Sequence, residues 1–357
     1  MPIPGGRNRS RYPPRAEPNT MNRPSRLLPA PSPDVQARRP RTEVSLTRVG
    51  IRGVEKVIRI DVDEGEGPQL FFAEIECYVD LNPGQAGVHM SRFEEVVNEA
   101  IDEAVPRESL KAEHLAARIA ERVREGQGGL RAEVSLAARY PETVPAPVSG
   151  KPTQQIYTLF GTAVASAAGT RTLTGVQAQG MTACPCAQEL VAAGARERLA
   201  ELGYEPDQIE EILGAVPVAT HNQRGIGTLY IGRAEDCANE IDARELRRIV
   251  ESSMSSEIYE LLKREDERAV VEKAHANPRF VEDCVREMIR QVAEAHPELA
   301  ADGGFVLARQ ENLETIHRHN VLAERSGELA EVLRELATGD HSPHHLTMRE
   351  WLEAPAS

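Results

Sequence analysis

The sequence lacks a long apolar run and has few aromatic residues. No stretch approaches the roughly 18 apolar residues that a membrane-spanning helix needs, and the N-terminus lacks the apolar segment of a signal peptide. Aromatic residues make up 4% of the chain, so the core must come mainly from Leu, Ile, Val and Ala. We therefore expect a cytoplasmic protein that makes no membrane contact.

The cysteine count is low and odd. There are five cysteines, Cys77, Cys184, Cys186, Cys237 and Cys284. An odd number in a chain of this length, without a secretion signal, does not indicate a disulfide framework. We expect reduced thiols, which are available as metal ligands or nucleophiles.

Several common nucleotide-binding and redox motifs are absent. The chain has no G-x-G-x-x-G after a strand, no G-x-x-x-x-G-K-[ST] and no C-x-x-C pair. Any bound nucleotide is therefore held without a Rossmann or phosphate-loop cradle. A thioredoxin-like redox protein that uses its cysteines without metal is a weak alternative for the same reason.

Acidic residues outnumber basic ones in the chain beyond its N-terminal region. Residues 1–42 carry nine Arg against Glu17 and Asp34, so the net charge of −14 leaves −21 on the rest of the chain. Such an acidic body argues against nucleic-acid binding, which needs many basic contacts to phosphates. We expect residues 1–42 to form a disordered basic tail, with Met21 as an alternative start.

Between the two ends, strand and helix periods alternate. Residues 69–80 and 130–140 alternate like strands and enclose two amphipathic segments, and the second half repeats this order. A long helix is predicted from Asp242 to about Leu262, with Lys263 to Glu267 at its end. Residues 187–214 resemble an insertion of two short helices. We predict an α+β fold with antiparallel sheets, divided into repeats 43–168 and 169–326, and a loose tail over 327–357.

The motif Cys184-Pro185-Cys186 lies between a predicted strand and a predicted helix. Proline favours extended backbone, in which residues i and i+2 face the same way, so both thiols are expected to point into one pocket. The alternative is a pair of small buried residues. We favour a metal or catalytic role because the pair sits at an element boundary near a helix N-terminus.

Other polar residues of interest are scattered along the chain. His221 precedes a predicted strand, and His317 and His319 share a face of an extended segment. Glu267 belongs to the charged run Lys263 to Glu267, and the charge pattern alone predicts a solvated helix end there. Catalytic metal sites take a few Cys, His and carboxylate ligands and leave one position for water. Cys184, His221, Glu267 and His317 would supply such a set.

Several short segments together resemble a known family. They are DVQ at 34–36, VGI at 49–51, HMSR at 89–92, CPC at 184–186, HNQR at 221–224, YELLKREDE at 259–267, NPRFVEDCVR at 277–286 and ETIHRHN at 314–320. In this order they resemble the prokaryotic GTP cyclohydrolase IB family, including its archaeal iron-dependent branch. The resemblance implies a tandem tunnelling fold, in which each sheet is backed by two helices, and a homotetramer with active sites at subunit interfaces.

The resemblance also implies residue roles and a cofactor. The metal ligands would be Cys184, His221, Glu267 and His317, around one divalent ion per active site, Fe(II), Zn(II) or Mn(II). Cys186 would assist proton transfer or the nucleophile. Glu282 would hold the guanine edge, Glu314 and His319 would contact substrate or ligands, and Lys263, Arg264 and Arg224 would contact the triphosphate.

The implied reaction opens the imidazole ring of GTP at C8, releases formate and yields 7,8-dihydroneopterin triphosphate. Residues 187–214 and the run at 219–228 look more like the archaeal branch, which makes a 2′,3′-cyclic phosphate with Fe(II). HMSRF at 89–93 looks more like the bacterial folate branch, and the basic tail belongs to neither. The cyclic phosphate product is therefore one alternative, and a non-catalytic purine- or pterin-binding protein is another.

Overall fold

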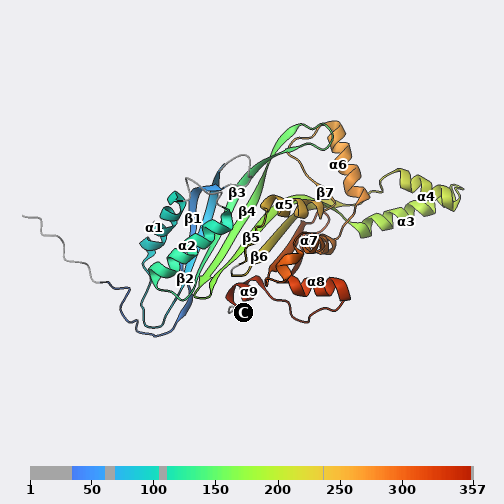
Figure 1. The fold of residues 1–357 in the computed structure, drawn as a ribbon. Helices are drawn as coiled ribbons and strands as arrows, with labels where there is room; N and C mark the ends of the chain where they lie inside the picture. The colour runs from blue at the N-terminus through green and yellow to red at the C-terminus, as the bar shows by residue number, and fades with distance from the viewer. Residues whose placement is uncertain (1–33, 61–68, 104–110, 236, 355–357) are drawn as a thin grey trace, which may run out of the picture. The chain divides into compact units, whose positions relative to one another are not determined.

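The computed structural model of the chain describes residues 34–60, 69–103, 111–235 and 237–354. Most of the predicted basic tail, including Met21, lies outside these residues. In the described part from Gln36 onward, nine strands form one antiparallel sheet in the order β1-β2-β3-β4-β5-β6-β8-β9, with β7 paired to β5 (Figure 1). The strands are β1 (Leu46–Ile60), β2 (Gln69–Leu81), β3 (Ala132–Pro145), β4 (Pro152–Ser166), β5 (Gly169–Ala183), β6 (Asn222–Arg233), β7 (Ser256–Glu257), β8 (Phe305–Leu313) and β9 (Val321–Glu328).

Two pairs of helices pack against this sheet. In the first half α1 (Met90–Glu103) and α2 (Ala112–Gln127) lie between β2 and β3 in the chain, and in the second half α5 (Ala243–Ser252) and α7 (Val281–Ala295) lie between β6 and β8. The order strand–strand–helix–helix–strand–strand thus occurs twice, with extra elements in the second half. The α+β fold with tandem repeats is confirmed. The division at residue 168 stays a prediction, because the sheet continues from β4 into β5.

The core is built from strands that bury alternate residues and helices that bury one face, as the sequence periodicity predicts. From Ala132 to Ala138 of β3 every second side chain is buried, which puts one face of this part of the strand against the helices. On α2 the buried side chains recur at helical spacing, at Leu115, Ile119 and Val123. Gly161 of β4 allows the start of α2 to lie directly on the sheet, because a Cβ there would come within 2.3 Å of the Ala112 carbonyl carbon.

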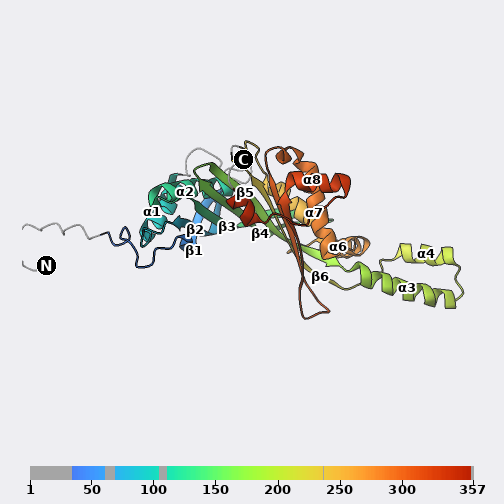
Figure 2. The same ribbon diagram turned by 90° about the horizontal axis from the view of Figure 1, so that it is seen from below.

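The inserted segment forms a helical hairpin. Helices α3 (Pro185–Glu201) and α4 (Pro206–Ala215) lie side by side beyond the ends of β5 and β6 in both views (Figures 1 and 2). The Arg196 side chain joins them through an ion pair with Glu210, with Nε 2.7 Å from the carboxylate oxygen. The prediction of two helices in this segment is therefore confirmed, although α3, with 17 residues, is longer than expected and begins at Pro185. Within the described residues, no helix is both long enough and apolar enough to cross a bilayer.

The long helix predicted from Asp242 to Leu262 is wrong. Helix α5 ends at Ser252, where the Ser253 hydroxyl donates a hydrogen bond back to the Ile249 carbonyl at 2.7 Å. The chain then forms β7, which pairs with β5, and a new helix α6 (Arg264–Ala276) follows. Glu267 therefore lies in the first turn of a helix. Serine hydroxyls that compete for backbone groups explain the early end of α5.

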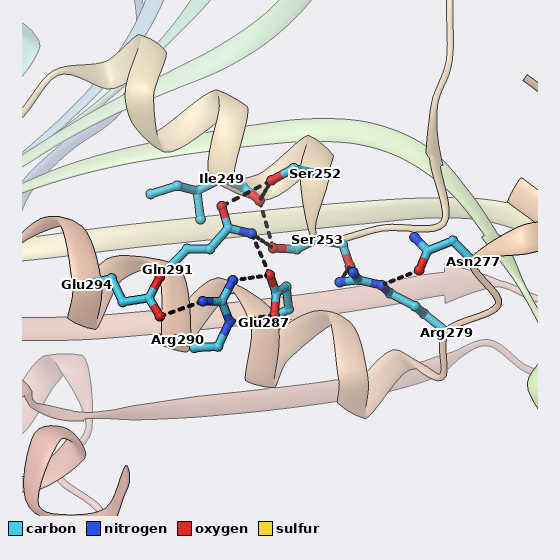
Figure 3. Close-up of polar contacts among 9 residues, drawn as sticks. All are labelled: Ile249, Ser252, Ser253, Asn277, Arg279, Glu287, Arg290, Gln291 and Glu294. Carbon is cyan, nitrogen blue, oxygen red and sulfur yellow. Dashed lines mark hydrogen bonds and ion pairs between the residues drawn. The ribbon is translucent and has the colours of Figure 1, made fainter. Parts of the chain in front are cut away.

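Helices α5 and α7 are joined by polar contacts (Figure 3). The Gln291 amide donates to the Ser253 hydroxyl at 3.3 Å and accepts from the Ser252 hydroxyl at 3.1 Å. Before the start of α7, the Arg279 guanidinium donates to the Ser253 carbonyl at 3.1 Å and to the Asn277 side-chain oxygen at 3.3 Å. These contacts fix the end of α5 against both the start and the middle of α7.

The loose tail predicted over 327–357 is also wrong for its described part. Residues after β9 form α8 (Leu329–Thr338) and α9 (Met348–Glu353). Trp351 of α9 is 1% exposed and stacks on Phe305, with ring centroids 5.3 Å apart. Its indole N–H donates to the Gly303 carbonyl at 3.1 Å. One tryptophan at the end of a polar stretch gives no period, so the sequence pattern could not reveal this anchor.

Candidate active site

Three of the predicted site residues meet at one end of the sheet. Cys184 directly follows β5, His221 directly precedes β6, and Glu314 directly follows β8. The strand register pairs Ala183 with Asn222 and Arg224 with Leu313, so the three positions are neighbours across adjacent strands. Residues 130 positions apart in the chain are thus placed at one edge by antiparallel pairing.

The Cys184 backbone is held on both sides. Its N–H donates to the His221 carbonyl at 3.1 Å, and its carbonyl accepts from the Thr220 hydroxyl at 2.7 Å. The half-buried thiol caps α3, because its Sγ accepts the Ala187 N–H at 3.5 Å. A sulfur atom at a helix N-terminus is in a position where a negative charge is stabilised.

The extended backbone expected through Cys184, Pro185 and Cys186 is wrong, and a pocket shared by the two thiols stays a prediction. Pro185 is the first residue of α3, so Cys186 lies in the first helical turn and is exposed. Cys184, the N-cap, has an extended backbone with φ −76° and ψ 116°, whereas Cys186 is helical, so the continuous extended backbone that would turn both thiols the same way is absent. Proline is favoured at the first position of a helix, and here it begins α3 instead of continuing the extended backbone of β5.

The residue before Cys184 is fixed by contacts that the sequence analysis missed. The Ala183 N–H donates to the Ser255 hydroxyl at 3.1 Å, and the Ala183 carbonyl accepts the Arg279 N–H at 3.0 Å. Arg279 is itself held by Ser253 and Asn277 (Figure 3). These partners lie on segments far apart in the chain, so no local spacing could have indicated them.

His221 is oriented by two oxygen atoms. Its Nδ1 is 3.1 Å from the Gln223 side-chain oxygen and 4.0 Å from a Glu314 carboxylate oxygen. The Glu314 side chain is 7% exposed and that of His221 15%. Two acceptors beside Nδ1 favour the tautomer that carries its proton there, which leaves the Nε2 lone pair available to bind a cation.

His317 and His319 lie in the connection between β8 and β9. Their rings stack with centroids 5.2 Å apart and planes 15° from parallel, and both side chains are exposed. The Thr315 hydroxyl ties this connection to the start of β6 through a 3.1 Å hydrogen bond to the Asn222 carbonyl. The two imidazoles thus form one surface that faces solvent in a single chain.

The remaining predicted residues lie on exposed helix starts and strand ends. Glu267, Lys263 and Arg264 are exposed at the beginning of α6, and Arg224 is exposed on β6. Glu282 is exposed in the first turn of α7, at a cavity of about 290 Å³. Apolar side chains of α7 and α8 line this cavity, namely Val285, Ile289, Val332 and Leu336.

A metal site is not complete within one chain. In the described residues, no three Cys, His, Asp or Glu side chains gather closely enough to hold a metal ion. Cys184 with His221, and His317 with His319, supply donors that suit zinc or iron. The chemistry of these donors thus fits a divalent metal. In the described part of a single chain, however, no three of them lie close enough to bind the same ion.

The five cysteines differ sharply in expected reactivity. Burial raises the pKa of Cys77 and of Cys284 to about 12, with the Glu133 charge adding to the effect at Cys77. At pH 8 such thiols are only about one ten-thousandth ionised, and the thiolate is the reactive form. Iodoacetamide should therefore label exposed Cys186 while sparing Cys77 and Cys284 in the folded protein. Peptide mass spectrometry checks this, and rapid labelling of Cys77 or Cys284 without denaturant would contradict the described packing.

The chain is similar in sequence to known GTP cyclohydrolases. Residues 32–323 match the family model described as Type I GTP cyclohydrolase folE2. The chain is 42% identical over 309 residues to GTP cyclohydrolase MptA of Methanococcus aeolicus, covering 85% of this chain and 99% of that protein. GTP cyclohydrolase MptA of Methanocaldococcus jannaschii is 39% identical over 308 residues, with 85% and 97% covered.

The chain also resembles a solved structure of different sequence. Uricase from Arthrobacter globiformis matches with a TM-score of 0.48 and 10% sequence identity, over 85% of this chain and 98% of that one. The extent of the family match and the identity to the MptA proteins settle the relationship. The chain belongs to the type I GTP cyclohydrolase folE2 family.

Proposed function

We propose that this protein is a GTP cyclohydrolase that opens the guanine imidazole ring at C8 and releases formate. The observation that carries the proposal is the pairing of Cys184 with His221 at one end of the sheet, beside the buried Glu314 carboxylate. A pure binding protein would not need a thiol-bearing residue and an oriented imidazole on paired strand ends. Membership of the folE2 family supports the same activity.

The predicted metal ligands are Cys184, His221, Glu267 and His317. A divalent ion held by them would supply Lewis-acid activation of water for attack at C8. Zn(II), Fe(II) and Mn(II) are the candidate ions, because a thiolate suits the first two and the harder donors tolerate the third. The buried Glu314 oxygen beside Nδ1 would keep the His221 ring in its ligating tautomer.

The other predicted residues would bind the substrate. The Glu282 carboxylate can accept hydrogen bonds from N1–H and the exocyclic amine of guanine together. Lys263, Arg264 and Arg224 are exposed cations that can contact the triphosphate. His319 would contact the substrate next to His317, and Cys186 would transfer a proton. Water adds at C8, a second hydrolysis releases formate, and the ribose carbons then close onto the diamine.

A second copy of the chain would complete the site. Glu267, His317 and Glu282 are exposed, and no three donor side chains meet in the described part of a single chain. Both features fit a site built between subunits, which we propose to be those of a homotetramer.

Two products are open to direct test. We propose 7,8-dihydroneopterin triphosphate as the product. The second candidate is the 2′,3′-cyclic phosphate made with Fe(II), because the MptA relatives are archaeal and the α3–α4 insertion resembles that branch.

Metal-free protein should release formate from GTP only after a divalent metal is added. The test adds Zn(II), Mn(II) or Fe(II) in turn under anaerobic conditions and measures formate and the pterin product by chromatography. Triphosphate or cyclic phosphate in the product then selects the branch. GTP binding without formate release under any metal would leave a non-catalytic binding protein instead.

A further inference from the structure

We propose that Asp266 is a positioning residue that ties the start of α6 to the tip of the β3–β4 hairpin. In this way, a turn in the first half of the chain fixes Glu267 and Arg264 of the second half. The inference rests on the proposed function for its catalytic consequence, but the tie itself can be measured separately.

The Asp266 carboxylate accepts four hydrogen bonds. One oxygen accepts the N–H groups of Val148 and Ser149, at 2.9 and 2.8 Å. The other accepts the Ser149 hydroxyl at 2.7 Å and the Lys263 N–H at 2.8 Å. The side chain is 0% exposed. Three of these bonds reach the hairpin and only one serves α6 itself.

These contacts satisfy the buried carboxylate on both oxygens, because each oxygen accepts two hydrogen bonds. Four donors that converge on one side chain match an acceptor-only carboxylate, and an amide in its place would set its NH2 group against donors.

The hairpin tip is shaped to receive this carboxylate. Between β3 and β4 the turn is closed by the Ala146 N–H, which donates to the Lys151 carbonyl at 2.9 Å. Gly150 has a φ of 63°, a left-handed value that glycine adopts without strain. The turn leaves the Val148 and Ser149 N–H groups free of the sheet, and Asp266 takes both.

Helix α6 has little else to orient its first turn. Along the helix only Asp266, Val270 and Ala274 are buried. Near its C-terminal end, Lys273 forms an ion pair with Glu257 of β7. Because helical residues three apart share a face, a fixed inward direction for Asp266 sets a common outward direction for Arg264 and Glu267. The predicted ligand and phosphate contact thus depend on the buried carboxylate.

The test uses the full-length protein with Asp266→Asn, which keeps the shape and removes the charge. Glu265→Gln is the matched control, because it neutralises an exposed carboxylate next to Asp266 in the same helical turn. Hydrogen exchange followed by mass spectrometry should speed up at least about tenfold in peptides 146–151 and 261–267 of the Asn variant. A peptide from β5, residues 169–183, should not change in either variant.

Steady-state assays supply the catalytic readout. With saturating metal, Asp266→Asn should lower kcat for formate release at least about tenfold, whereas Glu265→Gln should stay within about twofold of wild type. If the Asn variant does not fold, Ser149→Ala removes one hairpin bond and should give smaller changes of the same sign. Unchanged exchange in peptide 146–151, or faster exchange with normal kcat and KM, would overturn the inference. If the wild-type protein itself releases no formate, the proposed function is rejected. The hydrogen-exchange result then still decides whether Asp266 ties α6 to the β3–β4 hairpin.

Discussion

Replacing Cys184 with serine should lower formate release from GTP by about a thousandfold, with little effect on the fold. The thiolate is the softest donor in the proposed ligand set, and a serine hydroxyl is a poor metal ligand at neutral pH. Lewis-acid activation contributes several kcal/mol to such reactions, and about 1.4 kcal/mol corresponds to a factor of ten in rate.

The structure explains why the serine variant should remain folded. Cys184 is the N-cap of α3, where its side chain accepts the Ala187 N–H. Serine is among the residues that prefer this position, so its hydroxyl can make the same contact. The backbone bonds of residue 184 to His221 and Thr220 involve no side-chain atom of residue 184 and are kept.

Cys237→Ser is the matched control. Cys237 is half-buried, and its thiol lies 3.8 Å from an Asp302 carboxylate oxygen, away from the predicted ligands. We expect this variant to keep normal turnover and Cys184→Ser to bind less metal per chain, as measured by elemental analysis. Near-normal formate release by Cys184→Ser at saturating metal would remove Cys184 from the ligand set.

Much of the fold could be predicted because its elements have clear periods. The alternation in β3 and the buried stripe of α2 are both visible in the sequence and present in the structure. Their repetition in the second half then indicates the tandem order. Periodicity records which face is buried, and this is the property that a sheet backed by helices requires.

The errors occurred where a local interaction overrode periodicity. Ile258 and Leu262 continue a helical spacing from α5, but the serines at 252 and 253 end that helix and Asp266 caps a new one. In the same way Pro185 begins α3, although the strand before it suggests extended backbone. Capping and strand pairing decide such boundaries, and a single sequence shows them only weakly.

The site itself was only partly accessible from the sequence. His221 and Glu314 lie at the ends of different strands, and only the register of β6 with β8 places them together. Asp266 lies next to the predicted ligand Glu267, yet its role depends on a hairpin 117 residues away. Family resemblance can suggest residue types, but the supporting contacts require the fold.

Truncation of Trp351 to alanine should lower the free energy of unfolding by about 3–5 kcal/mol, the usual cost of removing a buried tryptophan. The ring is 1% exposed, stacks on Phe305 and has the Arg171 guanidinium 5.2 Å from its centroid. It also fills the space beside Gly232, where a Cβ would come within 2.7 Å of the indole. Guanidinium denaturation at fixed protein concentration measures the change.

Two further variants make this prediction specific. Trp351→Phe keeps most of the stacking on Phe305 and loses the hydrogen bond to the Gly303 carbonyl, so it should cost about 1–2 kcal/mol. Leu336→Ala, on the exposed side of α8, should change stability by no more than about 0.5 kcal/mol. A loss below about 1 kcal/mol for Trp351→Ala would mean that α9 is not docked in solution.

The same variant separates stability from catalysis. Trp351 contacts the start of β5 at Arg171, the end of β6 at Gly232 and the start of β8 at Phe305. Because the strands are antiparallel, the opposite ends of these three strands carry Cys184, His221 and Glu314. The anchor and the site thus share strands but not contacts. Turnover per folded Trp351→Ala molecule should therefore stay near that of the wild type, and a large fall would show that the far ends of β5, β6 and β8 transmit strain to the site.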